Sequence, residues 1–392
     1  MQDAVIIDVV RSPMGRGKDT GSLAALHPVE LLAQVFTSLV ERNGIDPARV
    51  DDVLVGCVGQ IGEQSGTPGR HAWLSAGFPI SVPSTTIERR CGSGQQAIDF
   101  AIQGVMAGAY DVVIAAGIES MSHVPMGANR KNSDPPGPGM HARFPELDSQ
   151  GVAAELIARK YGVSRDALDA LSAESHARAE RANKAGLLAS QITPIKLPDG
   201  RIVSEDETIR PNTTVERLAG LKPAFENEES RVRYPEMDWK VTAGNSSQIT
   251  DGAGAALIMS AESAARMGLR PRARIVASAV VGDDPVLMLT GVIPATHKVL
   301  GRANMTMDQI DWIEINEAFA SVPLAWSAEF DYDTAKINPW GGAIAFGHPL
   351  GASGIRLLSS MLAGLESTGG EYGLQTMCEA AGMANALILQ RL

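Results

Sequence analysis

The segment ERRCGSGQQAIDFAIQGVMAG, residues 88–108, places a cysteine at the start of a predicted helix. After its glycines, apolar residues recur at helical spacing, namely Ala97, Ile98, Ala101, Ile102, Val105 and Met106. Cys91 therefore falls at or near the first turn, where free backbone N–H groups and the helix dipole lower a thiol pKa. Arg89 and Arg90 would add positive charge. The alternative is a small buried cysteine at a tight helix start.

Two segments near the C-terminus supply chemical partners for this cysteine. GGAIAFGHPLGASG, residues 341–354, contains a histidine, and TMCEAAGMA, residues 376–384, contains a second cysteine. The CGSG at Cys91 lies 260 residues before the GASG at Gly351, and each opens a predicted helix. The strand-like pieces RVDDVLVGCV and QIDWIEINEAF have the same offset of 260 residues. This repeated offset predicts an internal duplication.

The order of predicted elements indicates a layered α/β protein. AVIIDVV, residues 4–10, is a continuous apolar run, which is typical of a strand covered on both faces. A predicted helix over residues 28–43 follows, and apolar strands alternate with helices up to residue 122. Residues 125–145 are rich in Pro and Gly and predict an exposed loop or interaction arm. Helices over residues 152–161 and after residue 164 complete a predicted insertion between two α/β halves.

Length, composition and charge narrow the class of protein. At 392 residues the chain is long enough for two or three domains. The chain is 44% hydrophobic but contains no apolar run of about 18 residues, so no membrane span is expected. A strand-like N-terminus and three cysteines, which cannot all pair internally, suggest a cytoplasmic, reducing location. The net charge of −11 argues against nucleic-acid binding, whereas residues 121–240 carry only −1 and would more easily meet a polyanionic ligand.

Five segments together resemble the thiolase family over essentially the whole chain: CGSGQQAI around Cys91, residues 242–255, NEAFA at residues 316–320, residues 341–354, and Cys378. The resemblance implies an α/β fold with a five-layered αβαβα core, built from two repeated βαβαβαββ halves with an inserted loop domain. We place the first half at residues 1–120, completed by about 248–268. The inserted domain, with coenzyme A binding and oligomerisation, spans residues 121–247, and the second half spans residues 269–392.

The resemblance also implies catalytic roles. Cys91 would be the nucleophile that takes up an acyl group from a 3-ketoacyl-CoA, and His348 would be the base that removes its proton. Cys378 would protonate the departing acetyl-CoA and then deprotonate incoming coenzyme A. Asn316, through a held water, and His348 would stabilise one developing oxyanion, and the backbone N–H groups of Cys91 and Ala380 would stabilise the other. Taken alone, Asn316 would be a strand-end residue and His348 a loop histidine.

One departure from the family concerns the segment CEAAGMA after the second cysteine. Ala380 and Ala381 stand where the family usually has glycines, and Glu379 precedes them. An alanine keeps the backbone N–H but resists a positive φ, so the second oxyanion site is open to displacement. Glu379 is also a candidate to alter Cys378.

Coenzyme A is expected as a co-substrate, with no permanently bound cofactor and no metal. Ser247 matches the family's serine at the pantetheine arm, and Lys222 lies where a basic residue faces the nucleotide. As single residues, a cap and a solvated charge are the simpler interpretations. The pair Ser149-Gln150 replaces the His-Met of acetoacetyl-CoA thiolases, which favours longer or bulkier acyl chains in β-oxidation. Residues 228–239 either shape that pocket or form a surface loop.

The sequence thus predicts a 3-ketoacyl-CoA thiolase, an acetyl-CoA acyltransferase that forms a homodimer or homotetramer. An acetoacetyl-CoA thiolase is the first alternative, and a catalytically impaired thiolase-like subunit with a structural role is the second. A 3-ketoacyl synthase of the same fold usually needs two histidines beside its cysteine, and NEAFA places Asn316 where one would be.

Overall fold

The computed structural model describes residues 2–392. Its large sheet consists of two sets of strands that have the same order and the same directions. The first set runs in the order β4 (Ser84–Ile87), β3 (Asp52–Gly56), β5 (Val112–Ser120), β8 (Thr250–Ser260) and β1 (Ala4–Arg11), with β2 (Gly15–Arg16) beside β8. The second runs in the order β10 (Trp312–Ile315), β11 (Tyr372–Glu379), β12 (Met383–Arg391) and β9 (Ala273–Gly282). A single residue pair, Ile6 with Ala273, joins the sets.

The pairing directions confirm the predicted duplication. β3 and β5 are parallel, as are β10 and β11, and β8 and β12 run antiparallel to their neighbours in each set. In the second set, the place of β4 is taken by one isolated parallel bridge between Ile313 and Ile337. Each half therefore follows the βαβαβαββ order, with one strand of the second half reduced to that bridge.

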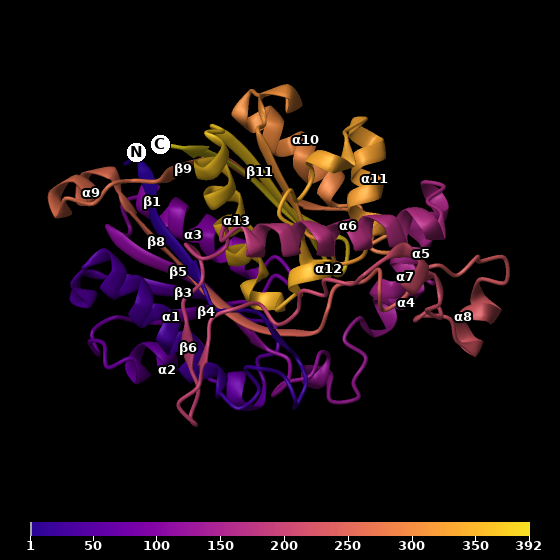
Figure 1. The fold of residues 1–392 in the computed structure, drawn as a ribbon, viewed down its shortest axis with the longest axis horizontal. Coiled ribbons are helices and arrows are strands. Elements are labelled where there is room, and N and C mark those ends of the chain that lie inside the picture. Colours follow the sequence, from indigo (N-terminus) through magenta and orange to yellow (C-terminus); the bar gives the residue numbers. More distant parts are fainter. Residues whose placement is uncertain (1) are drawn as a thin grey trace.

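Helices cover the sheets in layers, as Figure 1 shows. The helices of the two halves are α1 (Pro28–Asn43), α2 (Pro68–Ser75), α3 (Ser93–Met106), α9 (Ala261–Met267), α10 (Val292–Ala303), α11 (Ser321–Phe330), α12 (Ala343–Phe346) and α13 (Ser353–Thr368). Short 3-10 turns occur at η1 (Pro47–Arg49), η2 (Gly62–Gln64), η4 (Met307–Gln309), η5 (Thr334–Lys336) and η6 (Leu350–Ala352). α1 has the bounds that the sequence predicts and ends where Gly44 takes a φ of 59°.

Alternating side chains of β1 show why its sequence is a continuous apolar run. Val5 and Ile7 pack into the core beneath α1 and α2, whereas Ile6 and Val9 pack into a central core with α3 and α13. A third core lies between the second strand set and helices α10 and α11. The order is therefore helices, sheet, α3 with α13, sheet, helices, which confirms the five-layered αβαβα fold.

Glycines let the two central helices approach backbone to backbone. A Cβ on Gly94 would lie 2.5 Å from the Gly351 carbonyl oxygen, and one on Gly354 would lie 2.2 Å from the Gln95 backbone nitrogen. Larger residues would force the N-termini of α3 and α13 apart. The repeated CGSG and GASG segments thus place Cys91 of the first half against the second half.

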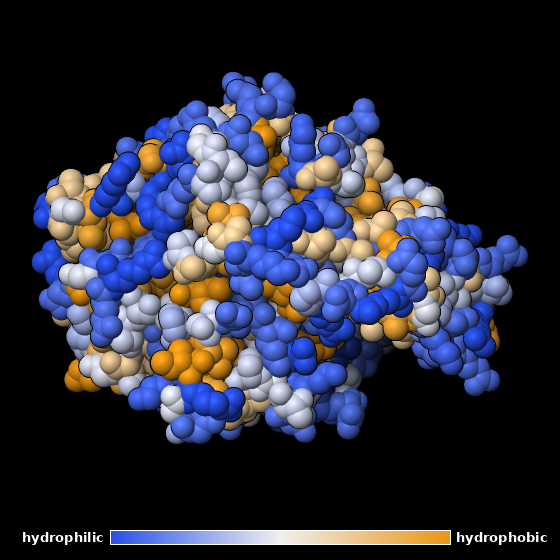
Figure 2. Space-filling view, viewed as in Figure 1, coloured by the Kyte–Doolittle hydropathy of each residue, from blue (hydrophilic) through white to orange (hydrophobic). Residues whose placement is uncertain are grey.

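The segment between β5 and β8 holds the remaining elements: η3 (Ala128–Arg130), α4 (Gly137–Arg143), α5 (Gln150–Lys160), α6 (Arg165–Lys184), β6 (Ile195–Lys196), β7 (Ile202–Val203), α7 (Val215–Ala219) and α8 (Glu228–Arg233). α5 contacts α11, α6 contacts α12, and α8 lies at one end of the molecule (Figure 1). That end has a largely hydrophilic surface in the view of Figure 2. Of the helices within residues 2–392, none is both long and apolar enough to span a membrane. The predicted domain boundaries stay predictions.

Candidate active site

Cys91 lies immediately before α3, in a turn held by backbone hydrogen bonds. Ser93 N–H donates to the Arg90 carbonyl at 3.1 Å, and Gln96 N–H donates to the Gly92 carbonyl at 2.8 Å. The Cys91 side chain is 3% exposed and packs against Leu357 of α13 and Met377 of β11. The second half of the chain therefore encloses the cysteine of the first half.

Burial shifts the pKa of Cys91 upward, whereas its place at the start of a helix predicts a lowered pKa. Its pKa is raised well above the ordinary value by desolvation, and charges at Cys378 and Glu379 raise it further. The backbone N–H groups of Cys91 and Ala380 oppose this rise, but burial dominates. Arg90 forms an ion pair with Glu88 at 3.2 Å. Burial therefore favours the thiol form of Cys91 over the thiolate.

His348 has a defined tautomer. Its backbone N–H is held by the Gln248 carbonyl at 3.0 Å and by Thr250 Oγ1 at 3.1 Å. Nδ1 lies 2.5 Å from Ser353 Oγ, and that hydroxyl donates its only hydrogen to the Pro349 carbonyl at 2.9 Å. With Ser353 as the donor to Pro349, we assign the ring proton to Nδ1 and the free lone pair to Nε2, an assignment that also lets Nε2 accept from Asn316 Nδ2. Burial, followed by the charge of Arg356, lowers the pKa of His348 to about 3, so the ring is neutral at pH 7.

Asn316, His348 and Cys378 meet where two parallel strands end. Asn316 follows β10, and its backbone N–H donates to the Thr376 carbonyl of β11 at 3.1 Å. Asn316 Nδ2 lies 3.4 Å from His348 Nε2 and 3.7 Å from Cys378 Sγ. All three side chains are buried. Burial raises the pKa of Cys378 to about 12, and the Asn316 hydrogen bond opposes the rise.

The hairpin after Cys378 contains Ala380, whose backbone N–H is the predicted second donor. Glu379 of β11 pairs with Met383 of β12 across the turn, in which Ala381 has a φ of 68° and Gly382 a φ of 72°. The Ala380 backbone N–H lies close enough to the Cys91 thiol to lower its pKa. Replacing glycine by alanine therefore leaves the donor facing Cys91, and the positive φ is taken up by Ala381.

Ser247 and Lys222, the two residues expected to contact coenzyme A, differ in their exposure to solvent. Ser247 is half-buried, and its backbone N–H donates to the Ala318 carbonyl at 2.9 Å, so it lies beside the NEAFA segment. Lys222 is exposed, next to Pro223, which pairs with Thr242. The structure thus brings Ser247 close to the Asn316 segment and leaves Lys222 at the surface. Within residues 2–392, no group of three or more His, Cys, Asp or Glu side chains is arranged to hold a metal ion.

Glu119 connects the two halves beside the site, and sequence reasoning missed it. This buried residue of β5 accepts hydrogen bonds from the backbone N–H groups of Val58 at 3.0 Å, Gly59 at 2.8 Å and Gly351 at 2.9 Å. Desolvation raises its pKa, and these donors lower it. A carboxylate inside the apolar run IAAGIES was the signal that could have revealed it.

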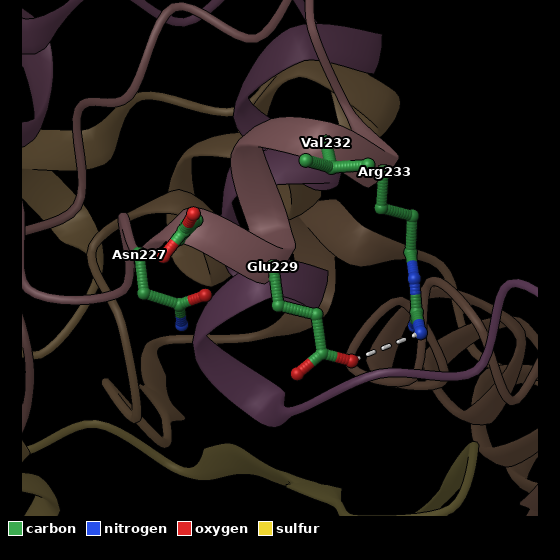
Figure 3. A pocket seen from close by; sticks show the side chains of 5 residues that line it. Asn227, Glu229, Val232 and Arg233 are labelled. Carbon is green, nitrogen blue, oxygen red and sulfur yellow. Dashed lines mark hydrogen bonds and ion pairs between the residues drawn. The ribbon is translucent and has the colours of Figure 1, made fainter.

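Two segments are expected to set acyl-chain preference, namely the pair Ser149-Gln150 and residues 228–239, and they lie at different places in the structure. Ser149 is the N-cap of α5 and accepts from the Val152 N–H at 3.3 Å. Figure 3 shows a hollow along α8, lined by Asn227, Glu228, Glu229, Val232 and Arg233. Arg233 pairs there with Glu229 at 3.4 Å, and Val232 is 79% exposed. This hollow is a surface feature of α8, whereas the apolar core that includes Cys378 also contains Met288 and Phe319.

Comparisons with known proteins agree with this site and fold. The family models described as "Thiolase, N-terminal domain" and "Thiolase, C-terminal domain" match residues 4–262 and 269–391. The chain is 43% identical to the steroid 3-ketoacyl-CoA thiolase FadA6 of Mycobacterium tuberculosis, over 100% of this chain and 95% of that protein. It is 40% identical to a beta-ketoadipyl-CoA thiolase of Acinetobacter baylyi, with 100% of both covered.

A solved structure extends the likeness to three dimensions. The Bacillus anthracis acetyl-CoA acetyltransferase superimposes with a TM-score of 0.89 at 36% identity, covering 100% of this chain and 99% of the other. Fold and comparisons together define a thiolase-fold acyltransferase. The chain belongs to the thiolase family.

Proposed function

We propose that the protein is a 3-ketoacyl-CoA thiolase, which uses coenzyme A to cleave a 3-ketoacyl-CoA into acetyl-CoA and a shortened acyl-CoA. The observation that carries the proposal is the meeting of Asn316, His348 and Cys378 within hydrogen-bond distances, with Cys91 packed against Met377, the residue before Cys378. Cleaving a carbon–carbon bond in this way needs one nucleophile and separate groups that move protons.

In the first half-reaction, His348 Nε2 accepts the Cys91 proton as the sulfur attacks the 3-keto carbon. The bond between C2 and C3 then breaks, and Cys378 gives its proton to C2 of the departing acetyl-CoA. Cys91 is left as an acyl thioester, Cys378 as a thiolate and His348 as an imidazolium. The raised cysteine pKa values suit this route, because neither thiol ionises before a carbonyl is in place.

In the second half-reaction, the Cys378 thiolate takes the proton of incoming coenzyme A. The coenzyme A sulfur attacks the acyl thioester, and Cys91 leaves and recovers its proton from His348. The Asn316 amide and His348 would stabilise the oxyanion of the acetyl group, and the Cys91 and Ala380 N–H groups that of the acyl group. Ser247 would contact the pantetheine arm, and Lys222 would face the nucleotide phosphates.

For the acyl group, we favour a medium, long or bulky chain degraded by β-oxidation. Ser149 and Gln150, in place of His-Met, support this preference, and Ser149 is the N-cap of α5. The relatives named for steroid and 3-ketoacyl-CoA substrates point the same way. The second candidate is an acetoacetyl-CoA thiolase, which the likeness to the Bacillus anthracis acetyl-CoA acetyltransferase favours.

Thiolysis of a ladder of 3-ketoacyl-CoA substrates, from acetoacetyl to long-chain and ring-bearing, separates these candidates. We expect turnover to rise with acyl size and to vanish in Cys91→Ala and Cys378→Ala. The highest kcat/KM on acetoacetyl-CoA would favour the second candidate. Absence of turnover with every substrate would refute the thiolase proposal.

A further inference from the structure

Behind Cys91 lies a group of polar side chains that the proposed reaction does not use. Each has at least one buried polar atom without a hydrogen-bond partner among the described residues: Arg89, Gln96, Asp99, Glu379 and Asn385. They come from the turn before α3, from α3 itself, from β11 and from β12. Unpaired buried polar atoms are costly, so a group of them beside reactive cysteines calls for a functional explanation.

Glu379 lies between the two cysteine segments. It follows Cys378 directly, and its carboxylate packs against Gly92, the residue after Cys91: a Cβ on Gly92 would lie 1.9 Å from Glu379 Oε1. Asn385 Nδ2 would lie 2.8 Å from the same point and donates to the Gly92 carbonyl at 3.1 Å. Only a glycine at position 92 leaves room for the carboxylate. Glu379 therefore touches the backbone that presents Cys91.

The charges that face Glu379 have opposite signs. Burial raises its pKa to about 8, Arg89 lowers it, and Asp99 of α3 raises it. Burial also raises the pKa of Asp99 to about 8, and the Ser278 hydroxyl of β9 and Arg89 oppose this rise. In turn, an ionised Glu379 raises the pKa of both Cys91 and Cys378. Two carboxyl groups, one arginine and two thiols are thus coupled through a water-poor interior.

We propose that Glu379 is a positioning residue whose charge controls how easily Cys91 and Cys378 lose their protons. A neutral Glu379 adds no charge beside the sulfurs, whereas an ionised Glu379 opposes formation of either thiolate. Thiolate formation should therefore rise less steeply with pH once Glu379 ionises. The effect on turnover rests on the proposed function, but the effect on thiol reactivity does not.

The test measures alkylation of Cys91 by iodoacetamide against pH, with mass spectrometry of the folded protein. In the wild type we expect an inflection near the Glu379 pKa of about 8. Glu379→Gln removes the charge at almost constant shape, so the inflection should disappear and the rate at alkaline pH should rise about 3- to 10-fold. Asp99→Asn should move the inflection to lower pH, because it removes a charge that raises the Glu379 pKa.

Glu41→Gln, on the exposed face of α1, is the control for loss of one negative charge and should keep the wild-type profile. If Glu379→Gln lowers the melting temperature but leaves the pH profile unchanged, Glu379 is only structural and the inference fails. If Asp99→Asn leaves the inflection where it was, the coupling is absent and the inference fails likewise. A wild type that shows the inflection but no thiolysis would refute the proposed function and leave this inference standing.

Discussion

Ser353 Oγ lies 2.5 Å from His348 Nδ1 and donates to the Pro349 carbonyl at 2.9 Å, which assigns the Nδ1 hydrogen to the histidine. Because Ser353 opens α13, the first turn of that helix fixes both the tautomer and the orientation of the imidazole ring. The free Nε2 lone pair therefore points to the side where Asn316 lies. Nε2 is thus the ring nitrogen available for the base role proposed for His348.

Ser353→Ala should lower kcat by about 10-fold or more, because the ring can then turn or change tautomer. KM should change less, since Ser353 lies behind the histidine, away from the Asn316 side. Ser353→Thr keeps the hydroxyl and is the matched variant that should restore most of kcat. Steady-state thiolysis with both variants checks this, and equal kcat for alanine, threonine and wild type would contradict it.

Ala381→Gly should stabilise the protein. Ala381 has a φ of 68°, a left-handed conformation that costs a residue with a Cβ about 1 kcal/mol relative to glycine. Glycine also gains freedom in the unfolded chain, so we expect a net gain of about 0.5 kcal/mol in the free energy of unfolding. Urea unfolding curves measure the change, and a loss of stability would contradict it.

Gly382→Ala is the contrasting variant in the same turn. A Cβ at this position would lie 2.6 Å from the Asp283 carbonyl oxygen, and the φ is 72°. Strain and close contact act together, so we expect a loss of about 2 kcal/mol or more. An unchanged urea midpoint for this variant would mean that the turn can rearrange, and the Ala381 prediction would then lose its basis.

Features that follow from a sequence pattern could be predicted, whereas features that depend on contacts between distant segments could not. The duplication and the doubly covered strand over residues 4–10 were predictable, because 260-residue spacing and apolar runs are written in the sequence. The direction in which the Cys91 pKa shifts could not be predicted, because it depends on burial by Leu357 and Met377, which lie far along the chain. The connection that Glu119 makes between the two halves depends likewise on where Gly351 comes to lie.

The oligomeric state stays a prediction from the family resemblance. The Pro- and Gly-rich segment over residues 125–145 lies mostly exposed, and its Met126 side chain is 61% exposed. Such an arm suits contacts between copies of the chain. Light scattering should give two or four times the 41.3 kDa chain mass. Shortening residues 126–140 to a Gly-Ser linker should turn any tetramer into a dimer, and a monomeric wild type would contradict the prediction.

Glu314, a buried residue of β10, should make the stability of the protein depend on pH. Burial raises its pKa from 4.5 to about 7, Arg356 opposes the rise, and Trp312 Nε1 donates to one carboxylate oxygen at 2.9 Å. Between these two pH values the unfolded chain releases a proton that the folded chain keeps. Stability therefore falls as pH rises through this window, by at most about 1.4 kcal/mol per pH unit.

Glu314→Gln removes this titration and keeps an oxygen that can accept from Trp312. Its free energy of unfolding should therefore fall less than that of the wild type between pH 5 and pH 7, values that bracket most of the Glu314 window. Glu371→Gln is the control, because Glu371 is an exposed residue just before β11. Its free energy of unfolding should change with pH as that of the wild type does. Urea unfolding at the two pH values decides the matter. Parallel curves for Glu314→Gln and wild type would show that Glu314 already ionises below this window in the folded protein, and that Arg356 outweighs burial.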